Sequence, residues 1–330
     1  MVPPVAALVT GDLLLRTPAT RFICPTTAGS ACRPHSHKET LMPSSDAVDP
    51  RLLTQIQTAT TRVLAELDRV CHELGVVYAV YGGTAIGAVR HQGFIPWDDD
   101  IDVCMERKDY ERFLAQAPAL IGEDFVIDSQ ESNARYPKTF AIMGLEGTEF
   151  VPAAAAERSY PIPIGVDVFP LDVMPEEPRA YRRQARRSWL WGRLLFLHGS
   201  ATPDTGLGTP LRQVADAVFR VTHWGLHAAR ITPRTIYRRW EQAARASEGT
   251  DSPWLGDFST QDPRRWSMRR DELLPVRRVP FGSIMVDIAH DYDAVLTRGY
   301  GDYMTLPPED ERVNHSPVRI SFGRHAPQVD

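Results

Sequence analysis

Cysteine and long apolar runs are scarce in this chain of 330 residues. None of its four cysteines forms a CxxC pair or stands with histidines at zinc-ligand spacing, so neither a disulfide framework nor a structural zinc site is predicted. The longest apolar run, residues 189–197, is far shorter than the roughly 20 residues that a membrane-spanning helix needs, and Gly192 and Arg193 interrupt it. The sequence therefore predicts a protein that is not integral to a membrane.

The chain also has fewer basic than acidic residues. The 37 basic residues are outnumbered by 42 acidic residues, and this balance argues against nucleic acid as a partner, because such binders carry a general positive field. Hydrophobic residues make up 43% and charged residues 24% of the chain, which is typical of a folded globular protein. No basic region precedes the apolar patches of residues 1–15, so no signal peptide is predicted. We expect a cytoplasmic protein with at most peripheral contact at the inner face of the membrane.

Composition divides the chain into four parts. Residues 1–48 are rich in Pro, Thr, Ser and Ala, which is typical of a disordered N-terminal arm. Residues 49–175 are predicted to form the catalytic core and residues 176–250 a helical insertion. Residues 251–330 are expected to fold back on the core and complete its site.

Hydrophobic periodicity predicts a mixture of helices and strands. Helices are expected at residues 49–74, 84–91, 109–120, 179–198, 211–245 and 292–298, and strands at residues 76–81, 101–105, 125–128, 139–143, 166–169 and 279–288, with a loop at residues 306–317. Such a mixture is typical of an α+β fold with a small mixed sheet flanked by helices.

Acidic side chains that could bind a metal ion are most concentrated at the start of one predicted strand, at Asp98, Asp99, Asp100 and Asp102. Alternation along a strand places Asp98, Asp100 and Asp102 on one face and Asp99 on the other. Three carboxylates on one face repel each other unless a cation lies among them, and oxygen ligands suit Mg²⁺ or Mn²⁺. The alternative is a solvated acidic turn after Pro96.

A Gly82-Gly83-Thr84 turn lies upstream, between a predicted strand and a predicted helix. Bare backbone N–H groups at such a turn can bind a phosphate, although a Gly-Gly pair is more often an ordinary turn. Together with the Asp-x-Asp strand, it predicts a site for a metal-bound nucleotide diphosphate. Asp167, between strand-forming residues, is the predicted third metal ligand; the alternatives are that it faces water at a sheet edge, or that Asp172 takes the role.

Three segments resemble one known family. Residues 81–110, with YGGTAIGAVRHQGFIPWDDDIDV at their start, are similar to the LicD family, and so are residues 166–172 and 291–315. These are nucleotidyltransferase-fold enzymes that include phosphocholine transferases and the fukutin-related proteins. The resemblance implies transfer of a phosphoryl-alcohol group, such as phosphocholine or a polyol phosphate, from a CDP-linked donor. The implied acceptor is a sugar hydroxyl of a cell-surface glycan or of a lipid-linked saccharide.

The resemblance also implies roles for individual residues. Asp100 and Asp102 would bind the metal ions and Asp167 would complete the set, while Asp98 and Trp97 would be accessory. Contacts to the donor phosphates would come from Gly82, Gly83, Thr84, Arg90, Lys138 and His315. His315 is equally well explained as an ordinary loop histidine. The implied reaction is an in-line displacement at phosphorus, assisted by divalent metal ions.

Two other functions stay open at this stage. The first is a nucleotidyltransferase that attacks an NTP to modify a small molecule, since it would share the fold and metal site. The second is a non-catalytic protein that binds glycans or nucleotides, although the retained Asp100 and Asp102 argue against it because paired carboxylates are costly. The basic and aromatic stretch at residues 182–197 predicts either a core helix with a solvated basic end or a contact with a glycan or membrane surface.

Overall fold

The computed structural model describes residues 49–152, 160–202, 209–312, 314 and 317–326. The predicted arm at residues 1–48 and His315 lie outside these residues. The helices of the described part are α2 (Pro50–Leu74), α3 (Gly82–Ile86), α4 (Arg107–Gln116), α5 (Pro178–Gly199), α6 (Thr209–Ala228), α7 (Pro233–Ala244), α8 (Arg270–Leu273) and α9 (Tyr292–Tyr300), with a π-helical turn at Gly87–His91. None of these helices is both long and apolar enough to cross a bilayer.

Strands from distant parts of the chain form one mixed sheet. They are β1 (Ala79–Val80), β2 (Ile101–Glu106), β3 (Phe125–Asp128), β4 (Ala141–Leu145), β6 (Gly165–Val173), β9 (Arg277–Phe281) and β10 (Ile284–Ile288). Their order across the sheet is β3-β4-β6-β2-β1-β10-β9. The pairs β2–β6 and β1–β10 are parallel, whereas β1–β2 and β4–β6 are antiparallel. The predicted α+β class is confirmed.

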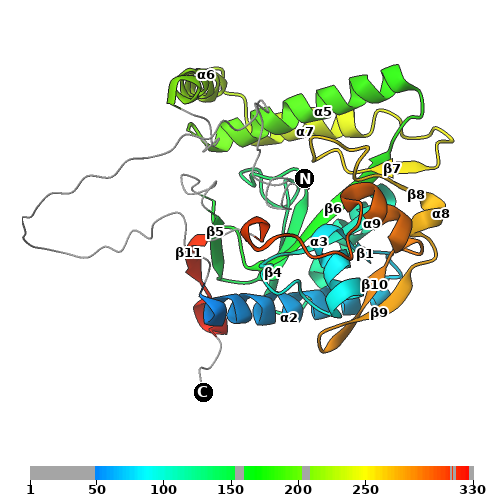
Figure 1. Cartoon of the computed structure of the whole chain (residues 1–330). Helices are drawn as coiled ribbons and strands as arrows, with labels where there is room; N and C mark the ends of the chain where they lie inside the picture. Colours follow the sequence, from blue (N-terminus) through cyan, green and yellow to red (C-terminus); the bar gives the residue numbers. More distant parts are fainter. Residues whose placement is uncertain (1–48, 153–159, 203–208, 313, 315–316, 327–330) are drawn as a thin grey trace, which may run out of the picture.

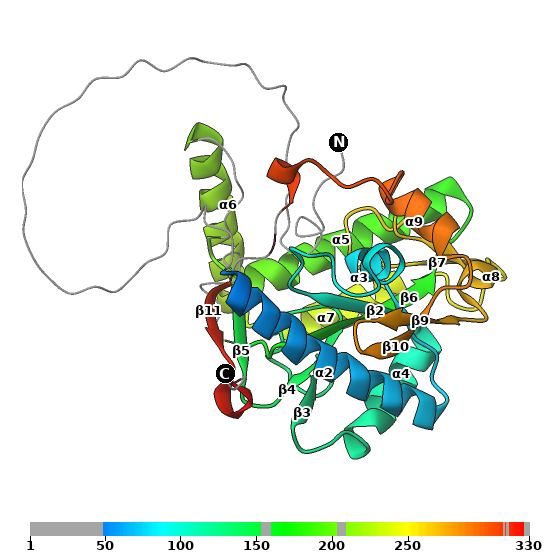
Figure 2. The ribbon, with the colours of Figure 1, turned by 60° about the horizontal axis from the view of Figure 1, so that its bottom comes forward.

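Helices cover both faces of the sheet, with α5 and α7 on one side and α2 on the other (Figure 1). Helix α2 lies obliquely across the strands, with α4 beside it (Figure 2). It begins where the Asp49 carboxylate accepts the Arg51 N–H and ends at Gly75, whose φ of 62° is the left-handed conformation that glycine tolerates. Its buried stripe, which includes Val63, Leu64 and Leu67, forms much of the core beneath the sheet.

Several predicted elements differ in extent. The predicted strand at 76–81 is only Ala79–Val80, and the helix expected from residue 84 already begins at Gly82. The predicted helix at 211–245 is two helices, because Thr232 caps a new helix that starts with Pro233. The extended segment at 279–288 is a hairpin that turns at Gly282, with a φ of 59°.

Four short strands were not predicted. Strand β7 (Trp254–Gly256) pairs with the end of β6 and with β8 (Met268–Arg269), and β5 (Glu149–Pro152) pairs with β11 (Pro317–Ser321). Through β7, β8, β9 and β10, the segment after residue 250 is built into the same sheet as the Asp-x-Asp strand. That pairing places C-terminal residues beside the site.

An internal ion pair decides the role of Asp172. Arg107 at the start of α4 donates from Nε and Nη2 to its two carboxylate oxygens over 2.8 and 2.7 Å. Both side chains are buried, at 7% and 2% exposure. Asp172 is therefore used in holding α4 to the sheet, which disfavours it as the alternative metal ligand.

Replacing Arg107 with alanine is expected to lower the free energy of unfolding by about 3–5 kcal/mol, because the buried Asp172 carboxylate would lose its counter-charge. Urea denaturation followed by circular dichroism measures this loss. Lys108→Ala is the matched control, since the neighbouring Lys108 side chain is 70% exposed and should change stability by less than about 1 kcal/mol. Equal losses in the two variants would contradict the assignment.

Candidate active site

The parallel pairing of β2 and β6 brings two of the predicted metal ligands together. Asp102 and Asp167 are direct partners in the register of the two strands. Since aligned residues of neighbouring strands project from the same face, the two carboxylates belong to one surface of the sheet. The backbone N–H of Asp102 donates to the Thr84 hydroxyl over 2.9 Å, so Thr84 holds the strand at this point.

The predicted alternation is wrong for Asp98, Asp99 and Asp100. Strand β2 begins only at Ile101, and these three residues follow a turn in which the Asp98 N–H donates to the Ile95 carbonyl over 2.9 Å. Because alternation applies only within a strand, Asp99 does not point away from its neighbours. One carboxylate oxygen from each of the three residues lies within 4.8 Å of the others.

Tyr300, at the end of α9, joins these carboxylates into one site. Burial first, and then the negative charges of Asp102, Asp98 and Asp100, hold the pKa of the Tyr300 hydroxyl well above its ordinary value. Gly82 lies against the same groups, since a Cβ added there would be 3.4 Å from Asp102 Oδ2 and 3.5 Å from the Tyr300 hydroxyl. The first glycine of the Gly-Gly-Thr turn is thus in close contact with the carboxylate site.

Lys138 supplies a positive charge to the site. Its ammonium group lies 2.8 Å from both carboxylate oxygens of Asp167. The same ammonium is 4.9 Å from the centre of the Phe140 ring. Lys138 was predicted to contact the donor, and it lies beside the carboxylates where a phosphate would need a counter-charge.

Arg90 and Trp97 contact the segment that follows α9. The Arg90 guanidinium donates to the Tyr303 carbonyl over 2.6 Å, and Arg312 stacks 4.9 Å from the centre of the Trp97 ring. Burial, and then the neighbouring Arg312, lower the pKa of Arg90. In this structure Arg90 positions the loop after α9, and its predicted contact with phosphate stays a prediction.

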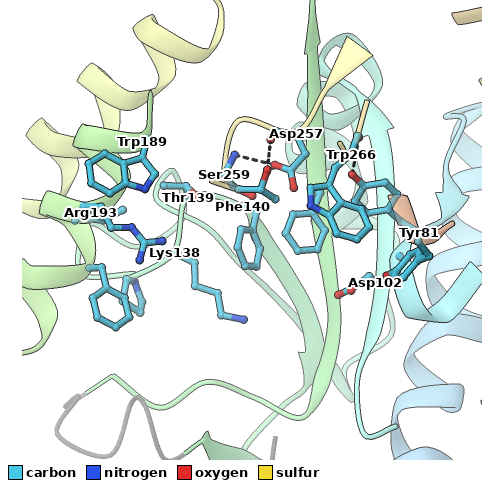
Figure 3. A pocket seen from close by; sticks show the side chains of 18 residues that line it. Tyr81, Asp102, Lys138, Thr139, Phe140, Trp189, Arg193, Asp257, Ser259 and Trp266 are labelled. Carbon is cyan, nitrogen blue, oxygen red and sulfur yellow. Dashed lines mark hydrogen bonds between the residues drawn. The ribbon is translucent and has the colours of Figure 1, made fainter. Parts of the chain in front are cut away.

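A pocket opens beside Asp102, between α5 and the sheet (Figure 3). Asp102, Gly82 and Lys138 form one side of it, and Trp189 and Arg193 reach it from α5. These two α5 residues are four positions apart, so they share one face of the helix. Arg182, Arg183, Arg186 and Arg187 are exposed on the same helix, so α5 has a solvated basic end, and its predicted contact with a glycan or membrane surface stays a prediction.

Aromatic rings make up much of the remaining wall. They are Tyr81, Phe140, Phe169, Trp266 and Tyr300, with Trp189 on the opposite side. The Tyr81 hydroxyl donates to the Trp266 carbonyl over 2.8 Å, which ties the wall to the segment after β7. Beyond Trp266 lies the carboxylate of Asp257, which is 1% exposed.

Four polar atoms around this pocket are buried without a hydrogen-bond partner in the described part of the chain. They are Trp189 Nε1, Arg193 Nε, Asp257 Oδ2 and the Tyr300 hydroxyl. Native proteins leave few buried polar atoms unpaired, because each costs about 1–3 kcal/mol. Their concentration around one pocket indicates a site whose hydrogen bonds are completed by water or by a ligand.

Sequence reasoning did not single out these pocket residues. Arg193 and Trp189 were noted only as part of a basic and aromatic stretch, and Tyr300 only inside a segment of family resemblance. Asp257 and Trp266 carried no local signal, because neither belongs to a motif and their position depends on the pairing of β7 with β6.

Comparisons with known proteins agree with the motifs. A domain model described as LicD/FKTN/FKRP, nucleotidyltransferase domain, matches residues 75–141. The lipopolysaccharide cholinephosphotransferase LicD of Haemophilus influenzae is 26% identical over 267 residues, which cover 80% of this chain and 95% of that protein. An uncharacterized protein of Rickettsia typhi is 43% identical over 59 residues, which cover 17% of this chain and 19% of that protein. The matched domain contains Gly82, Asp102 and Lys138, whereas Asp167, Asp257 and Tyr300 lie beyond it.

Proposed function

We propose that this chain is a phosphotransferase that moves phosphocholine from a CDP-linked donor to a saccharide hydroxyl, because residues 75–141 match the LicD/FKTN/FKRP domain model and most of the chain is similar to a cholinephosphotransferase. The observation that carries the proposal is that Asp102, the direct strand partner of Asp167, lines a pocket with unpartnered polar atoms. Similarity to a lipopolysaccharide cholinephosphotransferase along most of both chains supports a surface glycan or its lipid-linked precursor as the acceptor.

The carboxylates fit a hard divalent cation. Asp98, Asp99 and Asp100 offer oxygen atoms within 4.8 Å of each other, and the paired Asp102 and Asp167 add two carboxylates on the neighbouring strands β2 and β6. Oxygen ligands alone favour Mg²⁺ or Mn²⁺ over softer metals. We propose that Asp100, Asp102 and Asp167 hold the ion, with Asp98 accessory. When bound, such an ion would neutralise charge that develops on the phosphoryl oxygens.

The chain's own residues would position the donor. Lys138 and Arg193 project toward the pocket from the β4 side and from α5 (Figure 3), and charge-assisted hydrogen bonds from such groups are the strong contacts to phosphate. We propose that they hold the diphosphate of the donor. Gly82 leaves space for that group because it has no side chain, and the rings around the pocket exclude water from the phosphoryl centre.

A thermal-shift panel tests this function. The full-length chain would be heated with Mg²⁺ and CDP-choline, CDP-ribitol, CDP-glycerol, CTP, ATP or UTP, because a ligand that binds the native state raises the melting temperature. We expect a metal-dependent shift with a CDP-alcohol that Asp100→Asn loses while keeping its fold. A shift with an NTP alone would favour the nucleotidyltransferase alternative, and no shift with any compound would favour a non-catalytic binding protein.

Gly82→Ala is expected to impair donor binding as well as stability. An alanine at a φ of 57° is strained by about 1–2 kcal/mol, and its Cβ would occupy the space beside Asp102 Oδ2 and the Tyr300 hydroxyl, in van der Waals contact at 3.4 and 3.5 Å. Gly75→Ala is the matched control, since Gly75 has a φ of 62° but no atom within 4 Å of the added Cβ. Both variants should lose similar unfolding free energy, and only Gly82→Ala should lose the ligand-induced thermal shift. Equal shifts in both would argue against the close contact at Gly82.

A further inference from the structure

Basic side chains are concentrated in the helical segment that contains α5, α6 and α7. Residues 178–245 contain 13 arginines, no lysine and only three acidic residues, whereas the whole chain has 37 basic and 42 acidic residues. Eight exposed arginines lie on α5 and α7: Arg179, Arg182, Arg183, Arg186, Arg187, Arg234, Arg238 and Arg239. No salt bridge of the described part of the chain involves any of the eight. This segment therefore carries a local positive field on a chain that is acidic as a whole.

Helix α6 is attached to α5 through its histidines. His223 Nδ1 lies 2.8 Å from the carbonyl oxygen of Leu197, and His227 Nε2 lies 3.3 Å from the carbonyl oxygen of His198. The ring centres of His198 and His227 are 4.3 Å apart. Figure 2 shows α6 extending from this end of α5 away from the sheet. The side of α6 that carries the histidines is therefore the side that contacts the rest of the protein.

The other side of α6 exposes apolar side chains. Val214, Val218, Val221 and Trp224 are 65%, 56%, 74% and 65% exposed. Their spacing of three or four residues places them in one stripe along the helix, centred roughly half a turn away from His223. Isolated exposed apolar side chains are normal, but a continuous stripe of them marks a surface that binds a protein or a membrane.

We infer that this stripe and the exposed arginines of α5 and α7 form a surface that binds an anionic lipid bilayer. The valines and the tryptophan would enter the headgroup region, and the arginines would pair with lipid phosphates. Figure 1 shows α5, α6 and α7 along the same side of the molecule, so one surface offers both kinds of contact. The inference goes beyond the proposed function, because it concerns where the protein is placed and not the reaction.

Other occupants fit this surface less well. A second copy of the chain would bring two arginine-rich surfaces together, and like charges across an interface repel. A soluble anionic glycan would pair with the arginines and leave the stripe on α6 exposed to water. A bilayer with anionic headgroups accounts for both the apolar stripe and the positive charge.

The position of α5 connects this surface to the pocket. Trp189 and Arg193 line the pocket, and they belong to the same helix as the exposed Arg182 and Arg186. A bilayer that contacts the helical segment would therefore hold a lipid-linked saccharide close to the pocket. This last point rests on the proposed function, whereas the binding surface itself does not.

Vesicle sedimentation tests the inference. The full-length chain would be mixed with phosphatidylcholine vesicles that do or do not contain phosphatidylglycerol, at low and at high salt. We expect the chain to bind the anionic vesicles about 10-fold or more tightly than the neutral ones, and salt should reduce the difference because it screens charge. Val221→Asp should weaken binding to the anionic vesicles about 10-fold, because it places a charge in the apolar stripe. Val318→Asp is the matched control, since Val318 is 59% exposed on β11, outside the helical segment.

The arginines are tested separately. Arg238→Gln combined with Arg239→Gln should weaken binding to the anionic vesicles by about 10-fold. Arg51→Gln combined with Arg135→Gln is the matched control, because both side chains are exposed outside the helical segment. Trp224→Ser is a second variant of the stripe and serves if Val221→Asp does not fold.

The activity of the same variants separates this inference from the proposed function. CMP release from CDP-choline without vesicles should be unchanged in all of them, because none of the substituted residues lines the pocket. Absence of vesicle binding in a wild-type protein that still releases CMP would overturn the membrane inference alone. Vesicle binding by a protein that releases no CMP would support the membrane surface and count against the proposed function.

Two results would assign the surface to another occupant and overturn the inference. Vesicle binding that the arginine variants lower, but that Val221→Asp and Trp224→Ser leave unchanged, would indicate a surface for soluble polyanions. A dimer that forms without vesicles, detected by sedimentation velocity and dissociated by Val221→Asp, would indicate a second copy of the chain.

Discussion

Asp102→Asn is expected to lower kcat by about 10²–10³-fold while the protein keeps its fold. The loss of one preorganised electrostatic group at a reacting phosphoryl or acyl centre has effects of this size. Asp102 is held in place by its neighbours: its backbone N–H donates to the Thr84 hydroxyl, Asp167 is its partner on β6, and a Cβ added at Gly82 would lie 3.4 Å from its Oδ2. Turnover of CDP-choline, measured as CMP release, tests the expectation.

Asp102→Asn removes the negative charge of the side chain and keeps its shape. Asparagine has nearly the same volume as aspartate, so the core around β2 should tolerate it, and the melting temperature should stay equal or rise as like charges are removed. Asp271→Asn is the matched control, because the Asp271 side chain is 70% exposed on α8 and far from the pocket lining. CMP release at the wild-type rate by Asp102→Asn would remove Asp102 from the proposed machinery.

Asp257→Asn is expected to raise the free energy of unfolding at pH 7.5 by up to about 3 kcal/mol. Burial raises the pKa of the Asp257 carboxyl from 3.8 to about 6, with the hydrogen bonds from Ser259 acting in the opposite direction. Each unit of pKa shift corresponds to about 1.4 kcal/mol. Of the charged groups nearby, Asp172 adds to the increase and Arg107 on α4 opposes it. A residue that destabilises the fold in this way is typical of a binding site.

The direction of the pH dependence follows from the raised pKa. Between pH 3.8 and about 6 the folded state holds the proton that the unfolded state has released, so the ionised carboxylate costs stability fully only above about pH 6. The advantage of Asp257→Asn should therefore be largest at pH 7.5 and shrink as the pH falls toward 4. Urea denaturation across this range measures it, with the exposed Asp262→Asn as control. A constant difference at every pH would contradict the buried charge.

Local patterns in the sequence predicted most of the framework. The helix from Pro50 to Leu74 follows from its apolar period and its terminal glycine, and the strand from Ile101 follows from its β-branched residues. Both signals depend on residues a few positions apart, so they can be recognised without knowledge of the fold. The Asp-x-Asp pattern and the Gly-Gly-Thr turn likewise predicted a site for a metal-bound diphosphate, because their chemistry is local.

Other features depend on contacts between distant segments, and the sequence could not determine them. The register of β2 and β6 decides which residue is the partner of Asp102. The position at which β2 begins decides that Asp99 is grouped with Asp98 and Asp100. The ion pair with Arg107 decides that Asp172 has a structural role. The pocket depends most strongly on contacts between distant segments. Arg193, Asp257 and Tyr300 lie on three separated segments, and only the packing of α5 and the pairing of β7 bring them together. The sequence by itself determined most of the helices and strands and the motifs of the site, whereas tertiary structure decided which residues share the pocket, because a cavity exists only between elements.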